Sequence, residues 1–135
     1  MMNARSFVAV AASLLTGACS SAISAPQVVA PGGSVQLSAN GVASVSRSNV
    51  KVQFREVNDS RCPSDVVCVQ AGDAEIILNF SGAGAERTDS LYLVRTPRSV
   101  VYGGYRFEAV EVQPYPRTTE KAPAKTVALK VTSAP

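Results

Sequence analysis

The segment DSRCPSDVVCVQAG, residues 59–72, separates two stretches in which apolar and polar residues alternate. The first stretch covers residues 50–57 and the second covers residues 74–80. Side chains of a β-strand point to opposite faces in turn, so this alternation predicts two strands that are each buried on one face. Turn-forming and charged residues are dense in the segment between them. We therefore interpret residues 59–72 as the loop that joins two strands of the core.

The loop contains Cys62 and Cys68, with five residues between them. Pro63, Ser64 and Asp65 favour a chain reversal that brings the two thiols together. A disulfide is the expected state in an exported chain. The alternative is a redox or metal role, but the spacing is not Cys-x-x-Cys and two thiolates alone make a poor metal site. We predict a Cys62–Cys68 disulfide and no metal or cofactor.

Charged residues surround this predicted bridge, namely Asp59, Arg61, Asp65 and Asp73. One interpretation is an ion-binding or ligand-binding loop. The other is structural: Asp59 caps the turn and Arg61 pairs with a neighbouring carboxylate. The acidic residues lack the alternating spacing of a calcium loop, which favours the structural interpretation. If the loop contacts a partner, its candidate residues are Arg61, Ser64 and Asp65.

The remainder of the folded part has further short alternating segments, at residues 34–39, 90–94, 105–112 and 126–132. Turn residues separate them, among them Asn40-Gly41 and the stretch 81–85. The alternation loses its phase at Val57, which indicates either a β-bulge or the end of the strand, and it drifts near Val110. About seven short strands predict a single all-β domain over residues 32–135. We expect an antiparallel, immunoglobulin-like β-sandwich, with a closed β-barrel as the alternative.

Four aromatic residues occur near the C-terminal end, Tyr102, Tyr105, Phe107 and Tyr115. They could form an aromatic ligand platform, but such residues more often fill the core of a sandwich. Gly103-Gly104 then makes a hairpin turn or a bulge.

The segment that follows, residues 114–125, begins with prolines that end a strand. It is either a partner-binding segment or a plain loop. In the second interpretation the side chains of Lys121 and Lys125 are solvated.

Residues 1–18 have the pattern of an export signal. Arg5 is their single charge, and the apolar run of nine residues at 7–15 is too short to span a bilayer. The following LTGAC, residues 15–19, resembles the lipobox of bacterial lipoproteins. That resemblance implies cleavage before Cys19 and lipid attachment to Cys19, with residues 19–31 as a flexible tether. Thr16 departs from the Leu that is usual at its position.

Two destinations follow from this N-terminal pattern. Ser20, rather than Asp, after the cysteine resembles lipoproteins that are sorted to the outer membrane, so we expect a lipid-anchored protein of the bacterial envelope. Several acyl chains together anchor a protein stably. The alternative is an ordinary secretory signal that is cut after Ala22 or Ala25 and releases a soluble periplasmic or secreted protein.

Composition narrows the function classes. The chain has 135 residues, of which 46% are hydrophobic and 17% charged, and it contains no His and no Trp. The absence of His excludes a Ser-His-Asp triad and a His-ligated zinc site. The net charge is +3, or +2 once the leader with Arg5 is removed. This small, evenly spread charge predicts no nucleic-acid binding.

The cysteine segment, followed by a strand and by a later Gly-Tyr strand that ends in Pro-Tyr-Pro, resembles a group of small bacterial envelope proteins and lipoproteins. The resemblance covers roughly residues 32–133, and Gln70 stands where that group commonly has Trp. It implies an exported, disulfide-bearing β-domain. We expect a non-enzymatic binding or structural role with an envelope protein as partner. The alternative is an inhibitor-like module that presents the Cys62–Cys68 loop to an enzyme.

Overall fold

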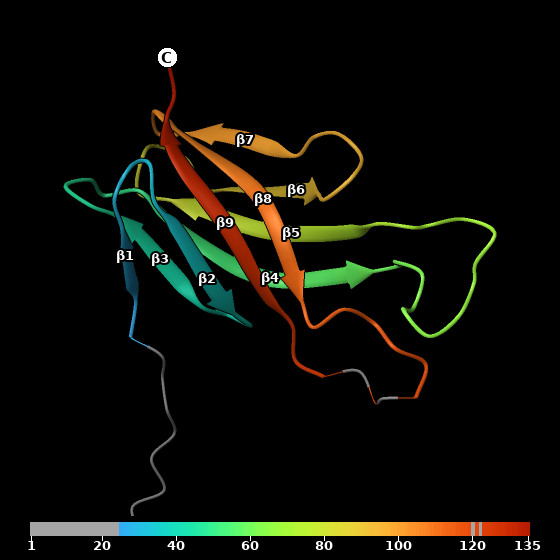
Figure 1. Cartoon of the computed structure of the whole chain (residues 1–135). Helices are drawn as coiled ribbons and strands as arrows, with labels where there is room; N and C mark the ends of the chain where they lie inside the picture. Colours follow the sequence, from blue (N-terminus) through green and yellow to red (C-terminus); the bar gives the residue numbers. More distant parts are fainter. Residues whose placement is uncertain (1–24, 120, 122) are drawn as a thin grey trace, which may run out of the picture.

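The computed structural model describes residues 25–119, 121 and 123–135. These residues form nine β-strands in two sheets packed face to face (Figure 1). The sheets do not close into a barrel, so the predicted all-β sandwich is confirmed. The strands are β1 (Gln27–Val29), β2 (Ser34–Ser38), β3 (Val42–Val45), β4 (Lys51–Asp59), β5 (Ala74–Ser81), β6 (Arg87–Tyr92), β7 (Ser99–Tyr102), β8 (Tyr105–Gln113) and β9 (Thr126–Ser133).

The five-stranded sheet has the order β1-β3-β4-β5-β6, and the four-stranded sheet has the order β2-β9-β8-β7. All pairings are antiparallel except that of β1 with β3, which is parallel. The described residues therefore contain more strands than the sequence predicted. The unpredicted ones, β1, β3 and β7, have only three or four residues each, too few for a clear alternation. Since β1 lies within the sheet, the folded part begins before residue 32.

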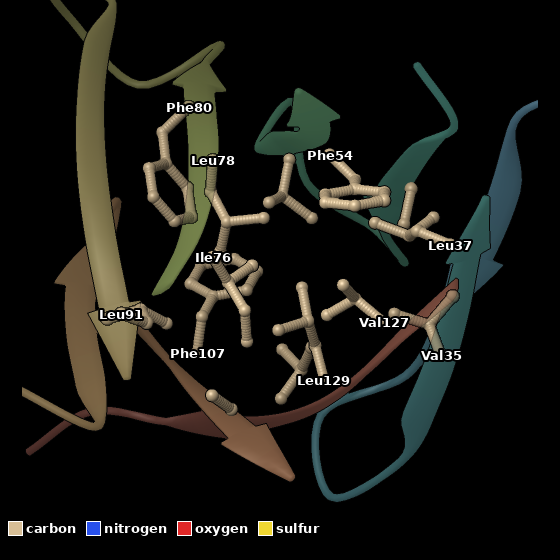
Figure 2. Packing of buried hydrophobic residues seen from close by; sticks show 14 of the residues in the cluster. Val35, Leu37, Phe54, Ile76, Leu78, Phe80, Leu91, Phe107, Val127 and Leu129 are labelled. Atoms are coloured by element: carbon tan, nitrogen blue, oxygen red, sulfur yellow. The ribbon is translucent and has the colours of Figure 1, made fainter. Parts of the chain in front are cut away.

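The core fills the space between the two sheets with aliphatic and aromatic side chains (Figure 2). Tyr105 is partly buried and packs against this core. The other inward-facing residues of the predicted alternating segments are buried, namely Val35, Leu37, Val50, Val52, Phe54, Ile76, Leu78, Phe80, Leu91, Phe107, Ala109, Val127, Leu129 and Val131. Two of the four aromatic residues near the C-terminus belong to this core. The ring centroid of Phe80 lies 5.0 Å from that of Phe107 and 5.5 Å from that of Tyr102. Tyr115 is instead 45% exposed.

Two β-bulges change the phase of the alternation, near the two positions where the sequence pattern shifts. One lies in β4 between Phe54 and Glu56, and the other in β8 between Ala109 and Glu111. Each inserts one residue, so the following residues exchange faces. In β4 the change makes Asp59 the direct partner of the buried Ala74. Directly paired residues share a face, so a carboxylate faces inward at the end of the core.

Side chains connect the two sheets at both edges of the sandwich. The side-chain amide of Gln27, in edge strand β1, donates to the backbone carbonyl of Gln36 in edge strand β2 at 2.8 Å. On the opposite edge, the guanidinium of Arg87 in β6 donates to the carbonyl of Val101 in β7, also at 2.8 Å. Each bond therefore joins the edge strand of one sheet to the edge strand of the other.

Gly82 and Gly84, in the β5–β6 turn, give a matched test of this packing. Both have positive φ, +95° and +88°, but a Cβ on Gly82 would lie 1.7 Å from the carbonyl oxygen of Asn49, whereas one on Gly84 meets nothing within 4 Å. We expect Gly84→Ala to lower the free energy of unfolding by about 1–2 kcal/mol through backbone strain alone. Gly82→Ala adds a clash with the backbone and costs more. Urea denaturation measures both, and equal losses would contradict the packing of the turn against Asn49.

Candidate functional site

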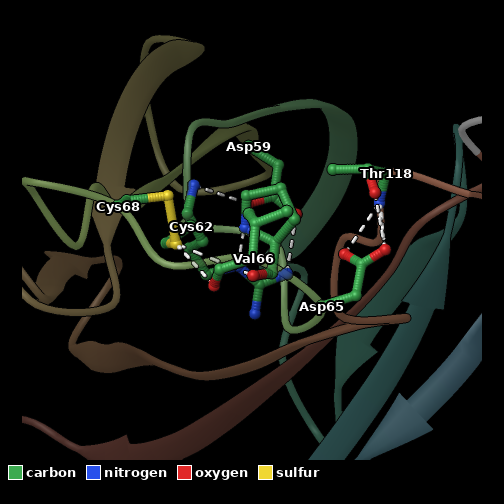
Figure 3. The surroundings of a disulfide bond; sticks show 8 residues. Asp59, Cys62, Asp65, Val66, Cys68 and Thr118 are labelled. Carbon is green, nitrogen blue, oxygen red and sulfur yellow. Dashed lines mark hydrogen bonds and ion pairs between the residues drawn. A yellow bond between two sulfur atoms is a disulfide. The ribbon is translucent and has the colours of Figure 1, made fainter.

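Two loops meet at one end of the sandwich. One joins β4 to β5 through residues 60–73 and the other joins β8 to β9 through residues 114–125. The backbone N–H of Ser64 donates to the carbonyl of Pro116 at 3.0 Å. The carboxylate of Asp65 accepts hydrogen bonds from the backbone N–H and the hydroxyl of Thr118, the former at 3.0 Å (Figure 3). We call these two connected loops the loop end.

The predicted disulfide between Cys62 and Cys68 is present, with the Cα atoms 5.9 Å apart. Backbone hydrogen bonds extend the β4–β5 pairing up to this bridge. The N–H of Ser60 donates to the carbonyl of Asp73 and the N–H of Cys62 to that of Ala71, both at 2.8 Å. The base of the loop is therefore a continuation of the sheet, and the disulfide closes the chain beyond it.

The carboxylate of Asp59 forms the centre of the loop end, and its side chain is only 7% exposed. The guanidinium of Arg61 donates two hydrogen bonds to it, from Nε at 2.8 Å and from a terminal nitrogen at 2.7 Å. Lys125 reaches it from the other loop, with Nζ at 2.9 Å, and also donates to the carbonyl of Pro114 at 2.7 Å. The guanidinium of Arg61 lies 4.4 Å from the ring centroid of Tyr115. The sequence correctly paired Arg61 with a carboxylate but wrongly placed Lys125 in solvent.

These contacts shift the pKa values of both partners. Burial raises the pKa of Asp59, but the hydrogen bonds from Arg61 and Lys125 together outweigh it and lower the pKa from 3.8 to about 2. The hydrogen bond to Asp59 in turn raises the pKa of Arg61. Both groups are charged at neutral pH, and the ion pairs connect the two loops.

A second buried carboxylate, Asp73, is 3% exposed and lies at the start of β5. It accepts hydrogen bonds from the backbone N–H groups of Ala74, Leu93, Val94 and Arg95, at 2.8 to 3.2 Å. Burial alone would raise the pKa of Asp73, but these hydrogen bonds together have a larger, opposite effect. The net shift of its pKa is therefore downward. Asp73 thereby holds the chain where it leaves β6, which is a structural role.

The three residues predicted to contact a partner also make contacts within the chain. Arg61 is 9% exposed and pairs with Asp59, while the backbone N–H of Ser64 bonds Pro116 and the carboxylate of Asp65 bonds Thr118. Ser64 and Asp65 remain exposed, and so do three valines of the same loop that the sequence analysis did not single out. Val66, Val67 and Val69 are 44%, 101% and 103% exposed. Their signal in the sequence is the apolar VVCV, which interrupts an otherwise polar loop.

A hollow of about 380 Å³ lies against the second loop. Its lining residues are Val57, Asp59, Tyr115, Pro116, Arg117, Pro123 and Lys125. Its volume is within the range of small-molecule pockets. However, Asp59 and Lys125 are the two ionic groups in it that approach most closely. These two charged groups of the hollow are therefore already paired with each other.

Three further findings concern the whole described part of the chain. Within residues 25–119, 121 and 123–135 no cluster of three acidic or cysteine residues could hold a metal ion. The same residues include no helix long and apolar enough to span a membrane. Cys19, the predicted lipidation site, lies outside the described residues.

Comparison with known proteins adds no relative. No protein-family model, curated protein or solved structure matches the chain.

The low pKa of Asp59 predicts how stability depends on pH. A carboxylate whose pKa is lower in the folded state stabilises the fold above its unfolded pKa, and the contribution disappears as pH falls through the folded pKa. We expect Asp59→Asn to lower the free energy of unfolding by about 1–2 kcal/mol at pH 7, a figure discounted for solvent screening near the surface. The difference between variant and wild type should shrink between about pH 4 and pH 2.

Chemical denaturation across this pH range measures the difference directly. Asp89→Asn is the control, because Asp89 pairs with the half-exposed Arg87 at the far side of the sheet. A difference for Asp59→Asn that stays constant down to pH 2 would contradict the ionic network.

The disulfide restrains a short loop, so its removal has a limited effect on the whole fold. We expect Cys62→Ser combined with Cys68→Ser to lower the free energy of unfolding by about 2 kcal/mol. Hydrogen exchange at the amide of Ser64, bonded to Pro116, should become faster, because the loop can move away from its neighbour. The amide of Leu129, in β9, is the internal control. Unchanged exchange at Ser64 would show that the disulfide does not restrain the loop end.

Proposed function

We propose that this protein is a lipid-anchored protein of the bacterial envelope whose β-sandwich is a non-enzymatic binding module. The signal-like residues 1–18 and the lipobox-like sequence before Cys19 support the anchor. The Cys62–Cys68 disulfide is compatible with an oxidising compartment outside the cytoplasm. Ser20 after the lipidated cysteine favours the outer membrane, with a soluble periplasmic or secreted form as the alternative.

The observation that carries the binding role is the restrained loop end. The disulfide, the Asp65–Thr118 contact and the Asp59 network hold two loops in one arrangement. A surface that is already ordered loses less conformational entropy when a partner binds. Its acidic groups favour binding over catalysis, because Asp59 and Asp73 are ionised and occupied by structural hydrogen bonds.

The same restraint favours a second candidate, an inhibitor-like module that inserts the Cys62–Cys68 loop into an enzyme. The loop projects from the sandwich at the end opposite the β5–β6 turn (Figure 1). A projecting, cross-linked loop can enter a cleft without first becoming ordered. This candidate differs from the first only in the identity of the partner.

Replacing Cys19 tests the anchor. We expect Cys19→Ala to move the protein from the membrane fraction to the soluble fraction, because diacylglycerol has no thiol to join. Fractionation of cells followed by immunodetection measures the distribution, and labelling with a radioactive fatty acid reports the modification itself.

The double variant Cys62→Ser with Cys68→Ser is the control, since it removes two cysteines and leaves Cys19. It should remain labelled and membrane-bound. A wild-type chain without label, or a Cys19→Ala variant that still sediments with membranes, would contradict the lipid anchor.

A further inference from the structure

The outermost part of the loop end is apolar. Val66, Val67 and Val69 lie next to one another in the chain, and the last two are fully exposed. Cys68 lies between these two, with its side chain drawn back to Cys62. Burying a valine side chain is favourable, so valines that remain in water forgo this stabilisation. Scattered exposed valines are ordinary, but an apolar group at the tip of a restrained loop indicates a contact surface.

The restraint on this valine tip identifies the kind of surface that it fits. The Ser64–Pro116 bond and the Asp65–Thr118 bonds fix the loop just before the tip. The disulfide fixes it at Cys68, between Val67 and Val69 (Figure 3). A lipid bilayer is fluid and adapts to any apolar insertion, so it gains little from a fixed geometry. A protein pocket has a fixed shape, and a restrained loop binds it with a smaller loss of entropy. The valine tip is therefore better suited to a pocket on a protein than to a lipid bilayer.

The tip also projects, which argues against pairing with a second copy. A stable protein interface buries about 1,200–2,000 Å² in total, and two projecting tips of three valines in contact would bury far less. A concave partner, by contrast, can enclose Val67 and Val69 from several sides. The required partner surface is a cleft with apolar walls.

Charge beside the tip indicates the rim of that cleft. Arg95 lines the same surface depression as Gln70 and Gly72 of the loop, and its side chain is 65% exposed. Its guanidinium lies 3.4 Å from the carboxylate of Asp73 and 4.5 Å from the ring centroid of Tyr92. The exposed carboxylate of Asp65 directly precedes the valines, so charges of both signs adjoin the tip and a polar rim would complement them.

From these contacts we propose that Val67 and Val69 are the anchors with which the loop enters an apolar cleft with a polar rim on another envelope protein. The inference rests on the proposed binding function and names its contact residues. Ser64 and Asp65 position the tip from behind, and Arg95 contacts the rim.

Site-specific photo-cross-linking in the source bacterium tests the proposal with the full chain. A benzophenone amino acid is placed at Val67 or Val69, and, as controls, at Val110 in β8 and Arg55 in β4, which are exposed on the strands. We expect positions 67 and 69 to yield an adduct with one other protein, identified by mass spectrometry, and positions 110 and 55 to yield none. The cross-linked peptide should come from an apolar cleft of that protein.

Binding of the identified protein in purified form then measures the anchors. We expect Val67→Ser with Val69→Ser to weaken binding by about tenfold or more, the size typical of anchor residues. Val110→Ser, an equally conservative change, should have no effect. Arg95→Glu should weaken binding most at low salt, because its contribution is electrostatic. All these positions are exposed, and thermal unfolding verifies that each variant is folded.

Each other outcome overturns the proposal in a recognisable way. Adducts with lipid alone would make the tip a membrane contact, and adducts with the same chain would make it a self-association surface. Adducts at positions 55 or 110 but not at 67 or 69 would leave the binding function standing and place its surface elsewhere. No adduct at any position would remove the binding function as well, while the fractionation of Cys19→Ala would still decide the anchor.

Discussion

The loop end depends on one buried carboxylate. Asp59 lies where the core between the sheets ends, and it attracts Arg61 from its own loop and Lys125 from the other. Removing an acid from water is unfavourable unless its oxygens accept hydrogen bonds, so the two cations must stay beside it. Because Arg61 also packs on Tyr115, the same interaction sets the position of the aromatic ring. Asp59 and Lys125 line the hollow, and Arg61 directly precedes Cys62 of the disulfide, so both features adjoin this ion cluster.

The strands of the core could be predicted from the sequence because their signal is local. In β5, Ile76, Leu78 and Phe80 lie at every second position and all three are buried, whereas Glu75, Ile77 and Asn79 between them are only partly buried. The short strands could not be predicted: β1 has three residues, and its pairing with β3 brings together segments that are not adjacent in the chain. Tertiary contacts, which no local pattern records, decide such pairings.

In the candidate site, too, contacts between residues close in the sequence could be predicted, and contacts between distant residues could not. The disulfide and the Arg61–Asp59 pair join residues within a few positions of each other, and both were predicted. The bond between Asp65 and Thr118 spans 53 positions, so nothing near Asp65 in the sequence indicates its partner. Asp65 is exposed, but its carboxylate also accepts hydrogen bonds from Thr118. The exposed valines that follow it in the loop were not singled out from the sequence.

The hydrogen bonds from Gln27 to Gln36 and from Arg87 to Val101 have a consequence for contacts with other chains. Unpaired backbone groups on an edge strand are templates for strand addition, the first step of β-aggregation. In both bonds a side chain of the facing sheet occupies a carbonyl of β2 or β7, the edges of the four-stranded sheet. One carbonyl on each of these edge strands is therefore already bonded within the molecule. These two long polar side chains thus make both edges less open to strand addition from another chain.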